Sequence, residues 1–195
     1  MAARFWSSVP RWGAMAFASL LCLGATAQAQ LKNENLLVGM PQGFKVGFTD
    51  SRNGMNMQEW VPVNETVQNW TEMVTVQVFL KRSDLDPVQF LATMEKQWAG
   101  ACKGSTATPM ASGKANGYAS ATMTLRCPLL ASSGKPETTM MKTIKGNDSF
   151  YVVQRAARSV PGEAQLARMK QYLETVSACD SRLPARPCPA LGAPK

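Results

Sequence analysis

The first thirty residues constrain this chain more than any other feature, because they decide the compartment in which the rest must fold. Arg4 and Arg11 precede an apolar stretch of eleven residues, 14–24. This stretch is too short to span a hydrocarbon core, which takes about 20 residues, but it suits the apolar region of a secretory signal peptide. Residues 27–29 then read Ala-Gln-Ala, a small-x-small cleavage site. We therefore expect residues 1–29 to be a cleaved signal peptide.

Other kinds of leader fit this sequence less well. Arg4 and Arg11 are not adjacent, which argues against the twin-arginine route. Cys22 follows Leu21, whereas a lipid-modified cysteine normally follows a small residue. No later stretch is long and apolar enough to span a membrane. The sequence therefore predicts a periplasmic or secreted protein with no stable membrane insertion after cleavage.

Four cysteines follow the predicted cleavage site. An even number in an exported chain predicts two disulfides. Cys102 follows the first predicted helix and Cys127 ends the next predicted strand, so packing of that helix on the sheet would bring the two together. Cys179 and Cys188 flank the exit of the last predicted helix. We therefore predict the pairs Cys102–Cys127 and Cys179–Cys188.

Histidine is absent from the whole chain, and its absence excludes several kinds of site. Nucleophiles of the Ser-His and Cys-His types need an imidazole, and so do the usual zinc and copper centres. The cysteines do not have the spacing of a zinc knuckle either. We therefore expect no metal site and no cofactor, and a non-enzymatic role is favoured over catalysis.

The charge of the mature chain is mildly basic and evenly spread. Removing Arg4 and Arg11 leaves 19 basic and 13 acidic residues, and Lys81-Arg82 is the only adjacent basic pair. A nucleic-acid binder would show a basic stripe with interleaved aromatic residues, which this sequence does not have. This distribution of charge therefore argues against a nucleic-acid partner, and it would suit an anionic partner in the cell envelope.

The remaining residues are enough for a single domain, which we place at 30–180, before a Pro-rich, irregular and mobile tail at 181–195. Alternating apolar residues predict six strands. Their ranges are 44–48, 55–61, 73–80, 118–126, 138–145 and 149–156. Asn64 is expected to cap a short helical turn that runs through 66–72.

Two longer segments have the pattern of amphipathic helices. Asp86-Pro87 begins the first, as an N-cap followed by a proline in the first turn, and Gly100 marks its expected end. The second follows Pro161-Gly162 and covers 163–178. Both carry apolar residues at helical spacing, so both are expected to pack on the sheet.

The order of these elements resembles the PsbP-like α/β sandwich, which occurs in photosystem extrinsic subunits and in small bacterial periplasmic proteins. The residues that carry the resemblance are the strands 140–144 and 150–155 across the turn 146–148, followed by the helix 163–178. The resemblance covers roughly 36–179. It implies an α+β fold in which a mainly antiparallel sheet of about six strands packs with two amphipathic helices. Because one fold hosts many unrelated roles, it implies no site residues.

The most distinctive segment for binding lies between two tryptophans ten residues apart. Trp60 and Trp70 enclose Glu65 and Asn69 on a loop-like crossing. Aromatic rings beside polar groups are common in pockets and interfaces, so these four residues are the predicted binding site. The alternative is that both rings fill the edge of the core. We expect Trp70 to be buried and Trp60 to lie near the surface, because Trp60 ends a strand close to Pro62.

These features together favour a non-enzymatic, exported accessory or binding domain that takes an envelope protein or a small ligand. One alternative is an envelope hydrolase that uses carboxylates, such as Glu59, Glu65 and Glu72, or a Ser-Lys pair. Another is a copper carrier, since thioethers suit Cu(I) and the pairs Met55/Met57 and Met140/Met141 are close in sequence.

The first prediction concerns processing. Protein exported from a bacterial host should begin at Gln30, because the Ala-Gln-Ala site precedes that residue. N-terminal sequencing of the released protein measures this directly. A full-length product that stays in the membrane fraction would contradict the signal-peptide interpretation.

Overall fold

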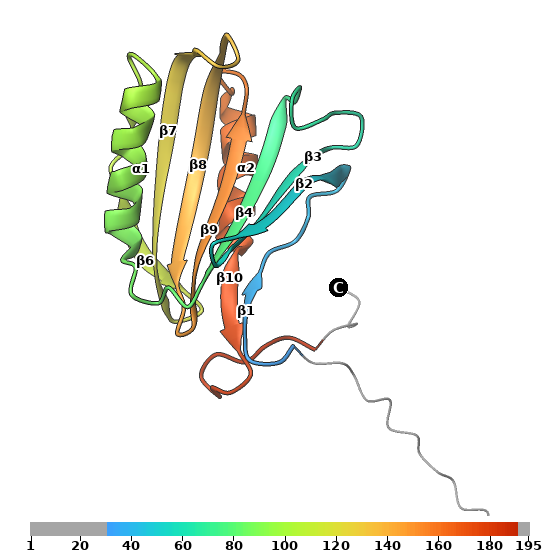
Figure 1. Cartoon of the computed structure of the whole chain (residues 1–195), viewed down its shortest axis with the longest axis vertical. Helices are drawn as coiled ribbons and strands as arrows, with labels where there is room; N and C mark the ends of the chain where they lie inside the picture. Colours follow the sequence, from blue (N-terminus) through green and yellow to red (C-terminus); the bar gives the residue numbers. More distant parts are fainter. Residues whose placement is uncertain (1–30, 191–195) are drawn as a thin grey trace, which may run out of the picture.

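The computed structural model of the protein describes residues 31–190, so the predicted signal peptide lies outside the described residues (Figure 1). Eight strands form one antiparallel sheet in the order β2-β3-β4-β9-β8-β7-β5, and β6 also pairs with β7. The strands are β2 (Phe44–Arg52), β3 (Met55–Pro62), β4 (Glu72–Leu80), β5 (Thr106–Ala107), β6 (Ala111–Ala115), β7 (Tyr118–Leu130), β8 (Lys135–Lys145) and β9 (Ser149–Ala157). The predicted fold class is confirmed. The sheet has eight strands rather than about six because β5 and β6 extend it beyond β7.

The two helices, α1 (Pro87–Ala101) and α2 (Glu163–Thr175), pack on opposite faces of this sheet. Strand β9 shows this division, because its successive side chains point to opposite faces. Phe150 packs in the apolar cluster that contains Leu91 of α1, whereas Tyr151 packs in the cluster that contains Leu173 of α2. Figure 1 accordingly shows α1 in front of β7 and α2 behind β9. Neither of these helices is long and apolar enough to cross a membrane.

Helix α1 begins as its sequence predicts. The Asp86 carboxylate accepts hydrogen bonds from the backbone N–H groups of Val88 and Gln89, both at 2.9 Å, and Pro87 occupies the first helical position. Such a cap satisfies donors that the first turn leaves without partners and is typically worth about 1 kcal/mol. The helix continues one residue past the expected stop at Gly100, and its C-cap is Cys102.

Helix α2 ends at Thr175, three residues earlier than predicted. The residues that follow form β10 (Ser177–Asp180), which pairs antiparallel with β1 (Glu34–Leu37). This pair was not predicted, because the first strand expected from the sequence begins at residue 44. A four-residue strand whose partner lies at the other end of the chain leaves almost no local sequence signal.

Strand β1 is fixed at the tip of the β8–β9 hairpin by one carboxylate. Glu34 accepts hydrogen bonds from the backbone N–H groups of Asn147, Asp148 and Ser149 and from the Tyr151 hydroxyl, the last at 2.8 Å. Successive backbone N–H groups in a turn form a concave site for an anion. Glu34 thereby joins the first strand of the described chain to the central hairpin.

The predicted helical turn over 66–72 does not form. Residues 63–71 are instead a loop closed by Thr66 and Asn69, whose backbone groups exchange hydrogen bonds of 3.1 and 3.2 Å. The loop packs against β2 at Gly47, where an added Cβ would lie 2.9 Å from Val67 and 3.0 Å from Val61. Glycine at this position therefore lets the loop approach the edge strand closely.

The structure contains two disulfides, and they are the pairs expected from the sequence. Cys102–Cys127 joins the end of α1 to β7, and Cys179–Cys188 joins β10 to the C-terminal segment. Residues 181–188 of that segment pack on the fold, whereas 191–195 of the predicted tail lie outside the described residues. The Arg186 guanidinium lies 3.8 Å from the Tyr118 ring centroid.

The second prediction compares the two cystines. Replacing Cys102 and Cys127 together by Ser should lower the free energy of unfolding by about 3 kcal/mol on the chain-entropy estimate. The same change at Cys179 and Cys188 should cost less, because that disulfide spans 9 residues rather than 25. Urea unfolding of the two double variants measures the difference. Non-reducing peptide maps that join Cys102 to Cys179 or Cys188 would contradict the pairing.

Candidate functional site

Helix α1 covers only part of its face of the sheet. Its apolar side chains pack over β7 and β8, and they extend as far as an aromatic cluster on β4 and β9. In that cluster the Phe90 ring lies 5.1 Å from Phe150 and 5.7 Å from Phe79. Beyond this boundary no helix of the described chain lies over the same face of β3, β4 and β9 (Figure 1). The uncovered area is where we place the candidate site.

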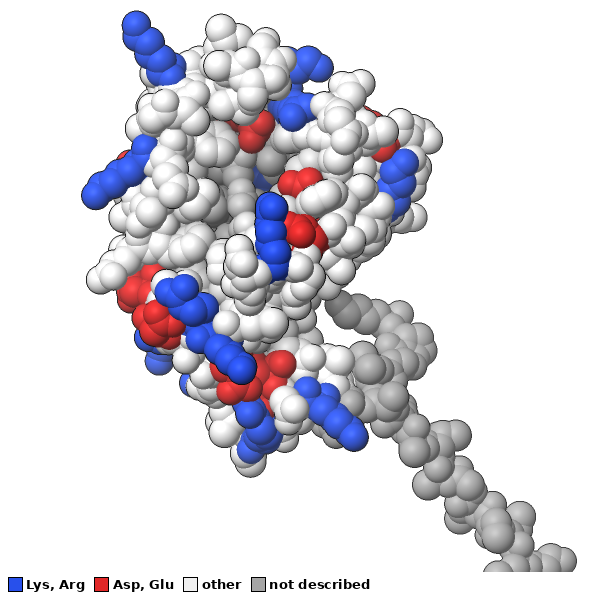
Figure 2. All heavy atoms as spheres, viewed as in Figure 1, with Lys and Arg blue, Asp and Glu red and all other residues white. Residues whose placement is uncertain are grey.

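The floor of this area is polar, although it lies at the centre of the sheet. Strand register puts Glu59 of β3 beside Thr75 of β4, and Thr75 beside Gln154 of β9, so the three share one face. Together with their neighbours they line a cavity of about 380 Å³, which we call the polar groove. Its lining residues are Met57, Glu59, Val67, Trp70, Met73, Thr75, Gln77, Glu137, Thr139, Gln154, Ala156 and Arg158. In Figure 2 this face is hollowed between α1 and β3, and acidic side chains lie around the hollow.

The polar side chains of the floor form a short hydrogen-bonded chain. The Gln154 amide donates to the Gln77 carbonyl at 3.4 Å. The Gln77 amide in turn faces the sulfur atoms of Met55 and Met57 at 3.7 and 3.8 Å. Thioether sulfur is only a weak acceptor, so this end of the chain is weakly held.

The wall of the groove is built around one arginine. The Arg158 guanidinium lies 4.0 Å from the centroid of the Trp70 ring and donates to the Gln68 carbonyl at 3.1 Å. Its Nε lies 4.0 Å from the Glu137 carboxylate, at the limit of an ion pair. This Nε is buried and has no hydrogen-bond partner among residues 31–190. An unpaired buried donor of this kind is costly, and such groups are uncommon in folded proteins.

The two carboxyl groups of the groove are both affected by burial. Burial raises the pKa of the Glu59 carboxyl. Burial also raises the pKa of the Glu137 carboxyl, while Arg158 and a hydrogen bond from Thr139 oppose the rise. Removing a carboxylate from water disfavours its charged form unless a cation or donors replace the water. Both groups are therefore incompletely compensated in the unliganded groove.

The structure places the two predicted tryptophans on opposite faces of the sheet. Trp70 lies in the wall of the polar groove, whereas Trp60 packs in the cluster on the α2 side. The expectation that Trp60 lies near the surface is wrong, since both rings are only 6% exposed. Leu36 and Val38, in and just after β1, pack against the cluster around Trp60. The sequence analysis missed that cover because it did not predict β1.

The other two predicted site residues belong to the loop between the tryptophans. Glu65 accepts hydrogen bonds from the backbone N–H and the hydroxyl of Thr71, at 2.6 and 2.7 Å. Asn69 is exposed and closes the loop through Thr66. Neither residue lines the polar groove, so the predicted set of four is not brought together. A binding role for Trp60, Glu65 and Asn69 stays a prediction.

Sequence reasoning missed most of the groove, although a signal for it exists. Gln77 and Gln154 interrupt the apolar runs of the two central strands, at positions that face a sheet side expected to be covered. A polar residue in such a place must find a partner or face a cavity. Glu137 and Arg158 lie at the ends of β8 and β9, where charged residues are ordinary.

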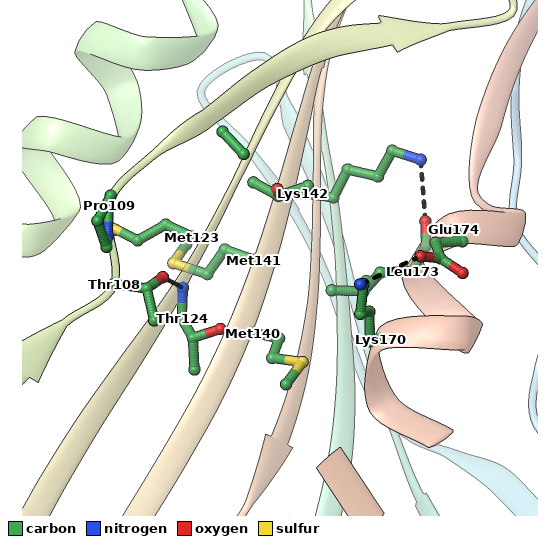
Figure 3. A pocket seen from close by; sticks show the side chains of 12 residues that line it. Thr108, Pro109, Met123, Thr124, Met140, Met141, Lys142, Lys170, Leu173 and Glu174 are labelled. Carbon is green, nitrogen blue, oxygen red and sulfur yellow. Dashed lines mark hydrogen bonds and ion pairs between the residues drawn. The ribbon is translucent and has the colours of Figure 1, made fainter. Parts of the chain in front are cut away.

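A second cavity, of about 240 Å³, lies on the opposite face beside α2 (Figure 3). Its charged groups already have partners. Lys142 donates to the carbonyls of Leu173 and Val176 at 2.9 and 2.6 Å, and Lys170 pairs with Glu174 at 3.9 Å. The rest of its lining is mostly apolar or threonine, and no serine contributes to it. The polar groove, whose charged groups are less well paired, is therefore the stronger candidate.

Among the residues of the alternative functions, Met55 and Met57 lie together, with both sulfur atoms within 3.8 Å of the Gln77 amide nitrogen, whereas the others are apart. Glu59 faces the groove, Glu65 lies in the loop, and Glu72 pairs with Arg155 on the α2 side. The methionines next to each other in sequence, Met140 and Met141, belong to the clusters on opposite faces. Residues 31–190 contain no group of three Cys, Asp or Glu side chains that could hold a metal ion.

No protein-family model and no curated protein match this chain. Solved structures similar to it include the PsbP protein CyanoP of Synechocystis, at 13% sequence identity and TM-score 0.48. The match covers 81% of this chain and 98% of the CyanoP chain. A protein of unknown function from Pseudomonas aeruginosa has 9% identity, TM-score 0.46 and coverages of 74% and 96%. The Ran-binding protein Mog1p of Saccharomyces cerevisiae has 11% identity, TM-score 0.44 and coverages of 75% and 90%. The resemblance to the PsbP-like sandwich is confirmed. It concerns the fold alone.

The third prediction concerns the two buried rings. Trp60→Ala should lower the free energy of unfolding by about 3–5 kcal/mol, because it empties a core position. Trp70→Ala should also be destabilising and should in addition release Arg158 from its stacked position. The urea midpoints of the two variants measure this, with Val63→Ala as a control at an exposed position. A Trp60→Ala variant that unfolds like the control would show that this ring is not part of the core.

Proposed function

We propose that this protein is an exported, non-enzymatic binding domain, and that its polar groove holds a small polar ligand. Export is supported by the pattern of residues 1–29 and by the two disulfides. The absence of histidine supports binding over catalysis, since it removes the commonest nucleophile and proton-transfer systems.

One observation carries the proposal of a ligand site. Polar side chains occupy the inward positions of the two central strands, β4 and β9, at a place where no helix of the described chain covers them. A sheet face at the centre of a sandwich is normally apolar and covered. Polar groups held there, half removed from water and imperfectly paired, lower the stability of the free protein. Departures of this kind from a stable arrangement are expected at functional sites.

The size of the groove fits a small ligand. Its volume of about 380 Å³ lies in the usual range for small-molecule pockets, about 300–1,000 Å³. Amides, hydroxyls and charged groups line it together with the edge of one tryptophan. Such a mixture fixes orientation through hydrogen bonds and gains contact area from the ring.

The fourth prediction tests this function on the mature domain. Small polar compounds (neutral sugars, amino acids, dipeptides and polyamines) are added one class at a time to labelled protein. A ligand of the groove should shift the side-chain amide resonances of Gln77 and Gln154 and raise the thermal midpoint, because binding to the folded state alone stabilises it.

A pair of variants makes the test specific. Gln154→Leu removes the hydrogen bonds of the floor with little change in volume, so it should abolish the response to the ligand. Thr122→Val, in the cavity beside α2 on the other face, should leave the response unchanged. The proposal fails if no class perturbs the groove resonances, or if Thr122→Val rather than Gln154→Leu removes the response.

A further inference from the structure

The carboxylates of the polar groove offer acceptors, and several of its donors are already engaged. The Gln154 amide donates to Gln77, and the Gln77 amide is turned toward two sulfur atoms. The Thr139 hydroxyl donates to the Glu137 carboxylate at 3.3 Å. Ionised carboxylates accept hydrogen bonds and donate none, and amide oxygens do the same. A ligand that pairs with these carboxylates must therefore bring donors of its own.

The charges of the groove also favour a ligand that brings donors. Three charged side chains line it, Glu59 on β3, Glu137 on β8 and Arg158 after β9, so two negative charges face one positive charge. Glu59 takes part in none of the ion pairs that residues 31–190 form. Arg158 is a weak partner for Glu137, since its guanidinium is also held by the Trp70 ring and by Gln68. The groove thus has an excess of negative charge in a chain whose formal net charge is +8.

Resting on the function proposed above, we propose that the ligand of the polar groove is a small organic cation that binds through a protonated amine. An ammonium group has three donors and one positive charge, and it has no acceptor. It would supply hydrogen-bond donors and positive charge to the carboxylates of Glu59 and Glu137. An anion would meet two carboxylates, and a neutral polyol would leave them uncompensated.

The buried Nε of Arg158 refines the class. It is a buried donor without a partner and lies 4.0 Å from the Glu137 carboxylate, so a ligand whose amine pairs with Glu137 gains a further hydrogen bond when an acceptor of the same ligand reaches this Nε. Diamines satisfy the carboxylates alone, whereas amino alcohols and amino sugars satisfy the carboxylates and the arginine together. The amine is the part common to them, and it is the part that the experiment tests.

The proposal has a definite dependence on pH. Burial raises the pKa of both carboxyl groups. Each therefore takes up its proton at a higher pH than an exposed carboxyl group does. A cation favours the charged forms, and its binding therefore releases protons near these raised pKa values. Binding should be strongest near neutral pH, where the carboxylates are ionised and the amine is still protonated. It should weaken as the pH falls through the raised pKa values of Glu59 and Glu137.

The fifth prediction is tested by calorimetric titration of the mature domain with putrescine. The matched neutral probe is 1,4-butanediol, which has the same length and hydroxyls in place of the amines. Putrescine should bind and butanediol should not, and the putrescine affinity should fall by about tenfold or more in Glu59→Gln and in Glu137→Gln. Glu174→Gln, an exposed acid outside the groove, should bind like the wild type.

The same variants give a second readout without ligand. Since burial disfavours the ionised groups, Glu59→Gln and Glu137→Gln should raise the urea midpoint at pH 7 and lose this advantage at pH 4, where the wild-type carboxyls are protonated. Weaker binding together with higher stability distinguishes loss of a ligand contact from a damaged fold.

The outcomes separate this inference from the function on which it rests. Equal binding of butanediol, or unchanged putrescine binding in both Gln variants, would overturn the inference. If putrescine leaves the Gln77 and Gln154 resonances unchanged while a neutral sugar shifts them, the inference fails and the groove is still a binding site. If none of the four classes of compound shifts them, the proposed function fails as well.

Discussion

Strand β9 is the element on which the rest of this structure depends. It pairs with β4 on one side and β8 on the other, and nearly all of its side chains are buried. Phe150 and Val152 form the base for α1, and Tyr151 and Val153 form the base for the cluster that includes α2. At about 25 cal/mol per Å² of buried apolar surface, such a strand is a large source of stability. Gln154 is then all the more notable, since it introduces a polar side chain into the strand that holds both layers together.

The sheet holds its buried arginines in two different ways. On the α2 side, Arg155 pairs with Glu72 and lies 4.6 Å from the Phe44 ring and 5.7 Å from the Tyr172 ring. Gln165 of α2 completes that arrangement by donating to Glu72 at 2.7 Å. On the other side, the Arg158 Nε lies 4.0 Å from the Glu137 carboxylate, and each of the two arginines leaves one buried nitrogen without a hydrogen-bond partner among residues 31–190. A closely paired buried ion pair resists change, whereas a loosely paired one can exchange its partners for those of a ligand. The contrast fits a structural role for the first arrangement and a binding role for the second.

Local patterns predicted the parts of this fold that depend on neighbours in sequence. The cap at Asp86 and the β8–β9 hairpin follow from residues within a few positions of one another. Long-range pairing was not predictable in the same way. Trp60 is buried because residues of and after β1 pack against its cluster, and β1 exists because β10 pairs with it. The groove depends on register across β3, β4, β9 and β8, which periodicity within any single strand does not specify. Trp70 was identified from composition, but the carboxyl and amide groups beside it come from strands that are distant in sequence.

The pairing of β1 with β10 has a consequence for how the chain reaches its final state. The first strand of the described chain has no partner other than nearly the last one, so it stays unpaired until the end of the chain has been delivered. Contacts between distant segments also form slowly, because a long loop must close before they are gained. The Glu34 carboxylate, which accepts hydrogen bonds from the tip of the β8–β9 hairpin, belongs to the same strand and is held in place by the same pairing. A polypeptide that emerges from its N-terminus therefore cannot form the β1–β10 pair early, although the eight-stranded sheet contains neither strand. The link between the two ends of the described chain is therefore completed last, after the segment that forms β10 has emerged.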